Sequence, residues 1–541
     1  MPAGRRALII SLNRVRFLMS AFPLGAAYVA GAARRAGWEV KLLDLCFVDD
    51  PATAAQKGIL GFQPDVILLS LRNLFTTSMF VIPTLKPLVD RIKEVACSDA
   101  DGVPVIIGGG AFSLFPREIL QYYGLRYGVV GEGEAAIGSL LRNYASLRHP
   151  ILECLRGVPG FCWMEDSHFC WNPPCLIRTL HRNARPFRDD VEPGLYQVEN
   201  IQTKRGCPLG CIYCTYPLLE GRKVRCRTAL DVVNELEDDL ILKRDVRDIA
   251  VVDSTFNNDL YYAKEVCREI VRRGLRVRLR AYVTPKFVDP ELVRLMKEAN
   301  FLIVELGVDS ACDKVLAALH KGFTKQKLAE VLSWFKQEGI WVYPSLLLRG
   351  PKETMDSIKE TLDFFEKVEP FQLFVNDSII IWPRTEIFRI ATRSGIVNCK
   401  TNLMKPTFYS TDGLGQKYDQ IKMIVREYQK RNPHWIYAPL GEMKIVDPAS
   451  GREPLDCVYQ KPWSEAATAS FKGSMNVLEP ILQDVFDLAV RQKAYESAVA
   501  KQHARIETVD VQEAVATAVP PPLRDILNRR VSNRTGTSSL P

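Results

Sequence analysis

The segment Lys204–Cys214, KRGCPLGCIYC, places three cysteines within eight residues. It directly follows the strand-like stretch 198–202, and a parallel barrel keeps its chemistry in the loops at the C-terminal ends of its strands. Three thiolates suit a 4Fe-4S cluster, because one iron then stays open to a further ligand. The predicted cluster ligands are Cys207, Cys211 and Cys214.

Two other interpretations of these cysteines stay open at this point. A structural zinc site needs four closed ligands, and no fourth Cys or His follows at a suitable distance, the nearest being Cys226 in a basic stretch. The cysteines could also be unrelated buried thiols, although their spacing directly after a strand argues against coincidence.

Strand-like and helical stretches alternate around this loop. From about residue 196 to 410, strand candidates are separated by helical segments, which predicts a second parallel α/β unit long enough for a partial barrel. The strand candidates are residues 249–252, 276–282, 301–306, 340–347 and 374–382.

The cysteine loop resembles the signature of the radical S-adenosylmethionine (SAM) superfamily, C-x3-C-x-aromatic-C, with Tyr213 at the aromatic position. The resemblance implies that SAM chelates the open iron and that Tyr213 lies against its adenine. It also implies an electron donor such as flavodoxin or ferredoxin, since reduction of the cluster would cleave SAM to methionine and a 5'-deoxyadenosyl radical.

Later segments resemble the rest of that barrel. In the stretch 251–257, VVDSTFN, the resemblance implies that Asp253 and Ser254 meet the methionine part of SAM, while helix capping is the alternative for Asp253. In the stretch 304–310, VELGVDS, it implies that Asp309 and Ser310 approach the ribose. No catalytic residue is predicted from the sequence.

Residues 1–150 show the same alternation of apolar strands and amphipathic helices, which predicts a parallel sheet covered on both faces. Three turns follow strands of this sheet, so they should gather at one edge, where glycines let the backbone approach a ligand. The residues of these turns are Ser70, Leu71, Arg72, Gly108, Gly109, Gly110, Glu132, Gly133 and Glu134.

That set of turns resembles the cobalamin-binding domain found ahead of many radical SAM domains, and the nine turn residues are its implied cobalamin contacts. The two resemblances together cover roughly residues 7–410. The D-x-H-x-x-G motif that supplies a histidine to cobalt is absent, since the first histidine is His149. A flavodoxin-like fold without a ligand is the alternative.

The remaining segments carry weaker signals. Residues 151–195 are rich in proline and predict a hairpin and linker, in which packed thiols are favoured over a second metal site made by Cys154, Cys162, Cys170, Cys175 and His168. Residues 411–513 predict a mainly helical region, with helices at 418–430 and 478–502, and residues 514–541 predict a flexible tail.

Two further groups of side chains have a functional and a structural interpretation. The basic residues Arg222, Lys223, Arg225 and Arg227 could bind a substrate carboxylate or phosphate, or form a solvated face. The aromatic residues Trp341, Tyr343, Trp382 and Tyr409 could line a substrate cavity, or belong to the core.

Composition limits the class of protein. The 541 residues are 47% hydrophobic and 25% charged, which is ordinary for a folded chain. The net charge of +8 is a small excess that gives no ground for nucleic-acid binding. The apolar runs are far shorter than the roughly 20 residues of a membrane span. We expect a cytoplasmic protein with 14 reduced cysteines.

The whole pattern predicts a Rossmann-like (flavodoxin-like) cobalamin domain, a partial TIM barrel and a helical C-terminal region. The resemblance implies a cobalamin-dependent methyltransferase that acts on an unactivated carbon of a small-molecule, lipid or peptide substrate. A radical cyclase or rearrangement enzyme is the alternative, and a cobalamin- or redox-sensing binding protein without turnover is the second alternative.

Overall fold

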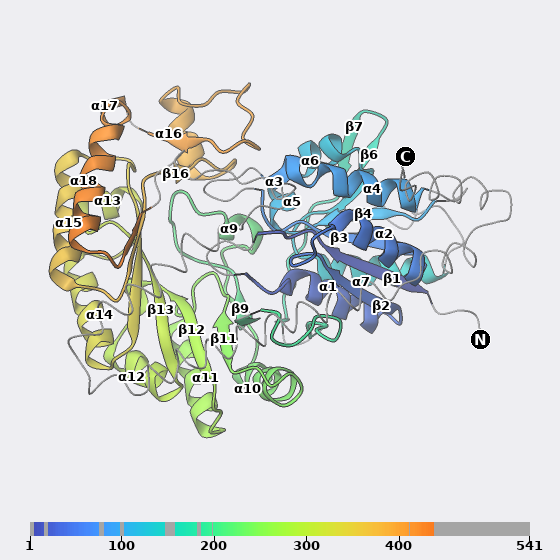
Figure 1. The fold of residues 1–541 in the computed structure, drawn as a ribbon, viewed down its shortest axis with the longest axis horizontal. Coiled ribbons are helices and arrows are strands. Elements are labelled where there is room, and N and C mark those ends of the chain that lie inside the picture. The colour runs from blue at the N-terminus through green and yellow to red at the C-terminus, as the bar shows by residue number, and fades with distance from the viewer. Residues whose placement is uncertain are drawn as a thin grey trace, which may run out of the picture.

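Two seven-stranded sheets organise the chain, and helices cover both (Figure 1). The structure is a computed structural model, which describes residues 5–15, 20–74, 81–97, 102–146, 157–180, 185–196, 198–410 and 412–437. In this part of the chain no helix is both long enough and apolar enough to cross a membrane.

The first sheet has the strand order β2-β1-β3-β4-β5-β6-β7, and its first five strands are parallel. They are β1 (Arg6–Ser11), β2 (Glu39–Asp44), β3 (Val66–Ser70), β4 (Val105–Gly108) and β5 (Tyr127–Val129). The helices between them are α1 (Leu24–Arg35), α2 (Pro51–Phe62), α3 (Val81–Thr84), α4 (Lys86–Ala96), α5 (Gly110–Leu114), α6 (Pro116–Tyr123) and α7 (Gly133–Ser146).

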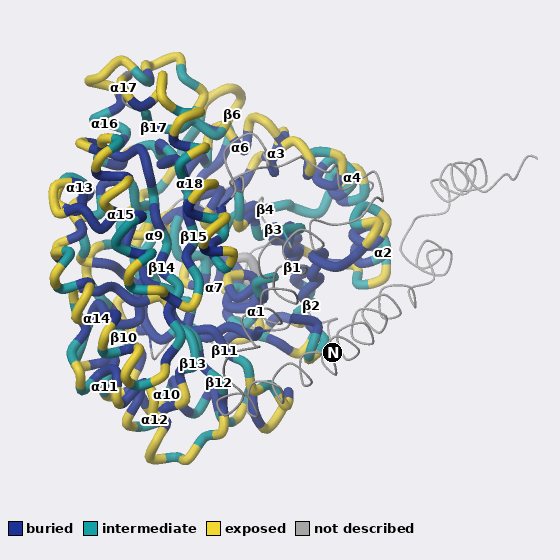
Figure 2. Tube along the Cα trace, turned by 60° about the vertical axis from the view of Figure 1, so that its left-hand side comes forward, coloured by how far each residue is buried: buried dark blue, intermediate teal, exposed yellow. Residues whose placement is uncertain are grey.

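Helices on both faces explain why these strands are almost continuously apolar. In β1, Ala7 and Ile9 belong to the hydrophobic cluster on one face of the sheet, and Leu8 and Ile10 belong to the cluster on the other. Figure 2 shows these strands buried between exposed helix surfaces.

The expected hairpin forms, but it extends the first sheet instead of linking two domains. Strands β6 (Phe161–Glu165) and β7 (His168–Trp171) add antiparallel to β5. Cys162 is paired with Trp171 and Trp163 with Cys170. Since neighbouring residues of a strand point to opposite faces, Cys162 and Cys170 cannot bind one metal ion. Cys154 lies outside the described residues.

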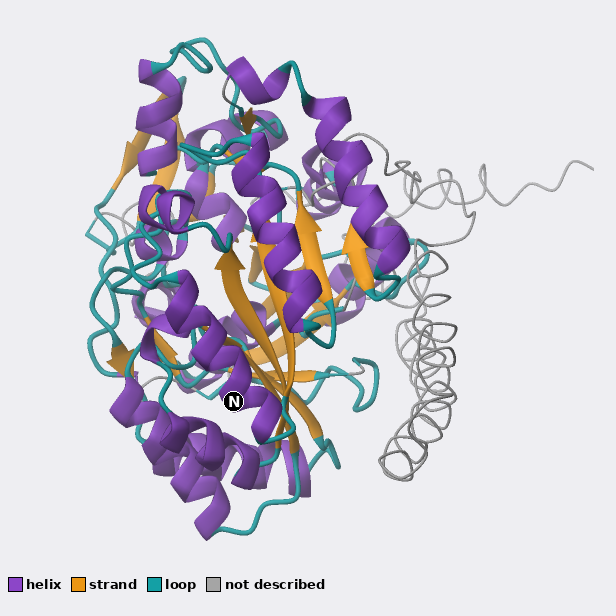
Figure 3. Cartoon of the chain, turned by 90° about the vertical axis from the view of Figure 1, so that its left-hand side faces the viewer, coloured by secondary structure: helices purple, strands orange, loops and turns teal. Residues whose placement is uncertain are grey.

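The second sheet is an open, parallel partial barrel with the strand order β18-β15-β14-β13-β12-β11-β8. Its strands are β8 (Glu199–Ile201), β11 (Asp248–Val251), β12 (Arg278–Val283), β13 (Phe301–Asp309), β14 (Trp341–Leu347), β15 (Leu373–Asn376) and β18 (Trp435–Tyr437). Figure 3 shows them with helices packed along one side. The predicted fold class is confirmed.

Helices and short ribbons connect the barrel strands. The helices are α9 (Tyr216–Leu219), α10 (Ala229–Asn234), η2 (Glu235–Leu242), α11 (Leu260–Arg272), η3 (Pro285–Phe287), α12 (Pro290–Glu298), α13 (Asp313–Ala318), α14 (Lys325–Gln337), α15 (Met355–Val368), α16 (Glu386–Arg393), α17 (Asp412–Gly415) and α18 (Tyr418–Arg431). The ribbons pair β9 (Lys204–Arg205) with β10 (Arg225–Cys226), and β16 (Ile379–Ile380) with β17 (Phe408–Tyr409).

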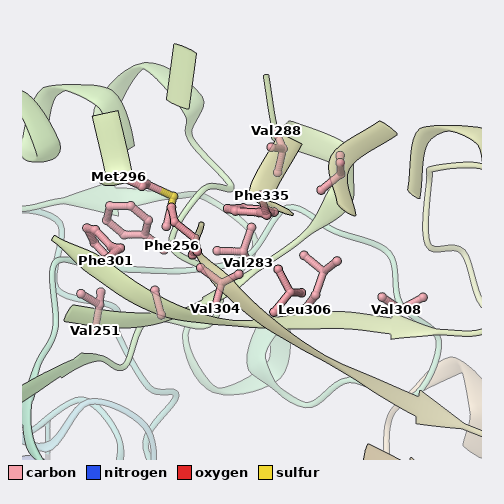
Figure 4. Packing of buried hydrophobic residues seen from close by; sticks show 14 of the residues in the cluster. Val251, Phe256, Val283, Val288, Met296, Phe301, Val304, Leu306, Val308 and Phe335 are labelled. Atoms are coloured by element: carbon pink, nitrogen blue, oxygen red, sulfur yellow. The ribbon is translucent and has the colours of Figure 1, made fainter. Parts of the chain in front are cut away.

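The core of the barrel domain lies between the sheet and its helices. Val304, Leu306 and Val308 of β13 pack on that side with Met296 and Phe335 from two helices (Figure 4). The residues that alternate with them therefore face the opposite, concave side of the sheet, which we call the lumen.

The C-terminal region is described only to residue 437. The helix predicted at 418–430 is confirmed by α18, and β18 adds a strand to the barrel that the sequence did not predict. The helix predicted at 478–502 and the tail predicted at 514–541 lie outside the described residues.

Candidate functional site

The three predicted cluster ligands lie on the loop after β8, at the carboxyl end of the barrel. Cys207 is buried, Cys211 and Cys214 are partly exposed, and all three are free thiols. The loop turns back on itself, with the Cys214 amide donating to the Cys211 carbonyl at 3.2 Å. Burial raises the pKa of Cys211, and it raises the pKa of Cys214 to about 12. Because thiolates are the form that binds metal, loading of a cluster would release protons from these groups.

Gly206 fixes the start of this loop. Its φ is 94°, and a Cβ here would lie 2.2 Å from the carbonyl oxygen of Lys223, so only glycine fits. The Gly206 carbonyl accepts hydrogen bonds from Ser254 Oγ at 3.3 Å and from Asn258 Nδ2 at 3.0 Å. Ser254, predicted to bind SAM, thus contacts the cluster loop itself.

Asp253 lies beneath the loop and does not point into the site. It is 1% exposed and accepts hydrogen bonds from Thr203 Oγ1 at 2.5 Å and from Lys204 Nζ at 2.7 Å. The backbone amides of Thr203 and Lys204 donate to its other oxygen at 2.7 and 3.2 Å. Both carboxylate oxygens thus position the cluster loop, and the SAM contact of Asp253 stays a prediction.

Asp309 lies beside the cluster loop, and its contact with the ribose of SAM stays a prediction. Its Oδ2 accepts from the Tyr213 hydroxyl at 2.5 Å and from Lys321 Nζ at 2.7 Å. It stands at φ 71°, where the register of β13 against β14 shifts. Burial alone would lower the pKa of Lys321, but Asp309 and Cys211 raise it above its usual value. Tyr213, Asp309 and Lys321 thus form one polar group.

Ser310 is turned away from this group. It is fully buried, its hydroxyl lies 3.1 Å from Thr361 Oγ1, and it accepts from the Cys312 amide at 3.1 Å. The Ser310 side chain therefore joins the end of β13 to α15, and its contact with the ribose stays a prediction.

The predicted glycine turn forms at the carboxyl edge of the first sheet. Gly109 has φ 107°, and a Cβ there would lie 2.4 Å from the Leu71 carbonyl oxygen. Leu71 donates its amide to Gly108 at 2.8 Å and buries its side chain. Ser70 is partly exposed and Arg72 is exposed. The turn therefore presents backbone, and not the Leu71 side chain, at this edge.

The two edges face each other across α9, which begins two residues after Cys214 and lies between the two sheets in Figure 1. A Cβ on Gly110 would lie 4.0 Å from Leu219 Cδ1 of α9. Arg72 is close enough to Tyr216 of α9 for its charge to act on it. A second contact joins the domains where Arg384 donates to the Ser113 carbonyl at 3.2 Å.

Glu132 and Glu134 form ion pairs with arginines of the barrel domain. Arg205 lies 2.5 Å from Glu134, and Arg225 lies 2.7 Å from Glu132, with all four side chains less than 10% exposed. Their carboxylates therefore join the two domains, and their contact with cobalamin stays a prediction. Gly133 between them begins α7.

Comparison with known protein families decides what these two edges are. The B12 binding domain family matches residues 11–141, and the Radical SAM superfamily matches residues 201–365. The chain carries a B12 binding domain followed by a radical SAM domain. The first match contains the glycine turn, and the second contains the cysteine loop and the Asp309 group.

Several known proteins are similar over most of their length. An uncharacterized methyltransferase of Pyrococcus horikoshii is 25% identical over 354 residues, covering 64% of this chain and 73% of the relative. Tryptophan 2-C-methyltransferase of Streptomyces laurentii is 24% identical over 428 residues, covering 66% and 70%. The radical SAM methyltransferase TsrM of Kitasatospora setae, solved with tryptophan and aza-SAM, aligns at a TM-score of 0.70 and 21% identity over 81% of this chain and 92% of TsrM.

The chemistry of the cysteine loop fits a 4Fe-4S cluster, because three cysteine ligands leave one iron open to a further ligand. A cluster binds each thiolate to a different iron, so its ligands surround the cluster without converging. Cys207, Cys211 and Cys214 would hold the cluster, and the charges of Cys207 and Cys211 act on Cys214.

The glycine turn leaves the backbone open to a bulky cofactor at the edge of the first sheet. The partly exposed Gly108 and the exposed Gly110 carry no side chain that would cover the backbone at this edge. The nine turn residues remain the predicted cobalamin contacts: Ser70, Leu71, Arg72, Gly108, Gly109, Gly110, Glu132, Gly133 and Glu134.

Lys321 and Arg205 were missed by the sequence analysis. Lys321 follows a helix in the stretch 315–323, and nothing in its spacing shows that its amine reaches Asp309. In the basic stretch, Arg225 and Arg227 are buried in ion pairs with Glu132 and Glu235, whereas Arg222 and Lys223 are exposed.

Proposed function

We propose that this protein transfers a methyl group from methylcobalamin to an unactivated carbon of a small-molecule, lipid or peptide substrate. The observation that supports this most strongly is that the cysteine loop and the glycine turn face each other across α9. The relatives that share both domains include methyltransferases. When bound, the cluster and SAM supply the hydrogen-abstracting radical, and cobalamin supplies the methyl group.

The residues of the chain would position these groups and exclude water. Tyr213 and Asp309, fixed by Lys321, would bind the adenosine part of SAM beside the cluster loop. The backbone of Gly108–Gly110 would approach the corrin. The buried pairs of Arg205 with Glu134 and of Arg225 with Glu132 would hold the two cofactor sites at a fixed separation.

The cluster would take its electron from a donor such as flavodoxin or ferredoxin. The cysteines of the described residues are free thiols, which supports a reducing compartment such as the cytoplasm.

The test is isotope transfer under anaerobic conditions. The protein is reconstituted with iron, sulfide and hydroxocobalamin, reduced, and incubated with trideuteromethyl-SAM and fractionated cell extract. We expect a product that gains one trideuteromethyl group, together with S-adenosylhomocysteine and 5'-deoxyadenosine. C211A removes a cluster ligand and should abolish product, while C399A removes an exposed cysteine outside the loop and should keep it.

Other outcomes identify the alternatives. A product that loses hydrogens and gains no label would establish the cyclase. Cobalamin binding without SAM cleavage would establish a binding protein.

A further inference from the structure

The lumen of the barrel holds a polar group on three neighbouring strands that no cofactor accounts for. Tyr282 of β12, Glu305 of β13 and Tyr343 of β14 are direct neighbours in the sheet register. The residues that flank Glu305, Val304 and Leu306, are fully buried on the helix side. Side chains alternate along a strand, so Glu305 and both tyrosines face the lumen.

Glu305 is surrounded by neutral donors. Ser345 Oγ donates to Glu305 Oε1 at 3.0 Å, and the hydroxyls of Tyr282 and Tyr343 lie close enough to stabilise the charge of the same carboxylate. Within the described part of the chain its interactions include no lysine, arginine or histidine. On the same face of β12, Arg278 pairs with Asp248 at 2.8 Å, and Arg280 acts on Tyr343. Glu305 is only partly buried, so its carboxylate can still take a charge-assisted hydrogen bond from a cationic ligand.

Open space lies beside this carboxylate. No atom lies within 4 Å of the place where a Cβ on Gly307 would stand. Gly307 lies midway along β13 between Glu305 and Asp309 of the predicted SAM site. At about 3.3 Å per residue, Glu305 is roughly 13 Å from Asp309 along the strand, so a ligand at Glu305 would lie deeper in the lumen than SAM.

Aromatic surface borders the same space. The Tyr282 side chain is 47% exposed and faces the lumen, and Tyr216 of α9 is 42% exposed. The charges of both Glu305 and Cys214 act on Tyr216. Tyr216 is therefore near the lumen group and near the cluster loop. Tyrosine rings attract cations through the negative charge of their faces.

We infer that Glu305, together with Tyr282, Tyr343 and Ser345, binds a positively charged nitrogen of the substrate, an ammonium or guanidinium group. The substrate class is then an amine-bearing molecule whose nitrogen is anchored at Glu305 and whose reacting carbon reaches toward Asp309 and the cluster loop. The inference rests on the proposed function in one respect, that the lumen receives the methyl acceptor.

Equilibrium dialysis of the reconstituted, cobalamin-loaded protein tests this without turnover. The probes are radiolabelled phenethylamine and 3-phenylpropionate, which share a phenyl ring and differ in charge. We expect binding of phenethylamine only. E305Q keeps the size and the hydroxyl contacts of the site, and it should weaken phenethylamine binding by about tenfold or more through loss of a charge-assisted contact. E330Q, at an exposed position of α14, is the matched control.

Equal affinity of the wild-type protein and E305Q for phenethylamine would overturn the inference, as would preferred binding of 3-phenylpropionate or no binding of either probe. Iron content shows that E305Q is folded and loaded. Dialysis does not depend on turnover. Glu305-dependent amine binding without methyl transfer would therefore contradict the proposed function and leave this inference standing. Methyl transfer to a substrate without a cationic nitrogen would contradict this inference and leave the proposed function standing.

Discussion

Arg205 and Glu134 form a buried ion pair of 2.5 Å across the boundary between the cobalamin-binding domain and the barrel. Arg205 stands two residues before Cys207, so the edge of one domain is tied directly to the cluster loop of the other. Glu132 forms two further ion pairs across the same boundary, with Arg205 at 3.5 Å and with Arg225 at 2.7 Å. The separation of the two cofactor sites is therefore set by side chains with little freedom to move.

Replacing Arg205 with methionine should destabilise the protein strongly. The change leaves Glu134 buried without its cation, which typically costs about 3–5 kcal/mol. Chemical unfolding followed by circular dichroism measures the loss. R393M breaks a pair with Glu386 in which the arginine is 71% exposed, and should cost less than about 1 kcal/mol. Similar losses in the two variants would contradict a structural role for the buried pair.

Asp253→Asn should reduce cluster loading although Asp253 does not reach the cluster. The substitution removes the charge that pairs with Lys204 and replaces an acceptor with a donor opposite the amides of Thr203 and Lys204. We expect less iron per protein after reconstitution and a loss of stability of about 3–5 kcal/mol. D245N, at an 89% exposed side chain, is the control. Full iron content in D253N would refute the positioning role.

Glu353 should make stability depend on pH. It is 5% exposed, and burial raises its pKa to about 8, so the folded protein holds its proton more tightly than the unfolded chain does. Its contribution is full below about pH 4.5, the ordinary range of a glutamate, and is lost as pH rises through about 8.

The neutral variant E353Q escapes this loss. Its free energy of unfolding relative to wild type should rise between about pH 5 and about pH 9 by on the order of 4 kcal/mol. Urea unfolding across this range measures it. A difference that does not change with pH would mean that Glu353 ionises normally in the folded protein.

Gly109→Ala should prevent cobalamin retention. A methyl group there would collide with the Leu71 carbonyl at a φ of 107°, so the turn would have to move. Absorbance after gel filtration measures bound cobalamin. Gly25→Ala in α1, where no atom lies within 4 Å of the new methyl group, should retain cobalamin. Equal retention by both variants would show that the Gly109 turn does not shape the site.

Much of the fold could be predicted because its signals are local. The apolar strands, the helices between them and the spacing of Cys207, Cys211 and Cys214 are all visible within short windows of sequence. The strand β18 was missed, because three residues after a helix give no strand pattern until β15 lies beside them.

The side-chain partners at the site could not be predicted from the sequence, because they come from distant residues. Glu132 meets Arg225 from 93 residues away, and Tyr213 meets Asp309 from 96 residues away. In the same way Asp253 meets Lys204, and Ser310 meets Thr361.

The most direct measurement of the central claim is a joint assay of cobalamin, iron and SAM products in wild type and C211A after anaerobic reconstitution. We predict that wild type retains cobalamin and a cluster and yields 5'-deoxyadenosine on reduction, whereas C211A retains cobalamin but yields none. A wild-type protein that forms its cluster and cleaves SAM but does not retain cobalamin would contradict the two-cofactor account.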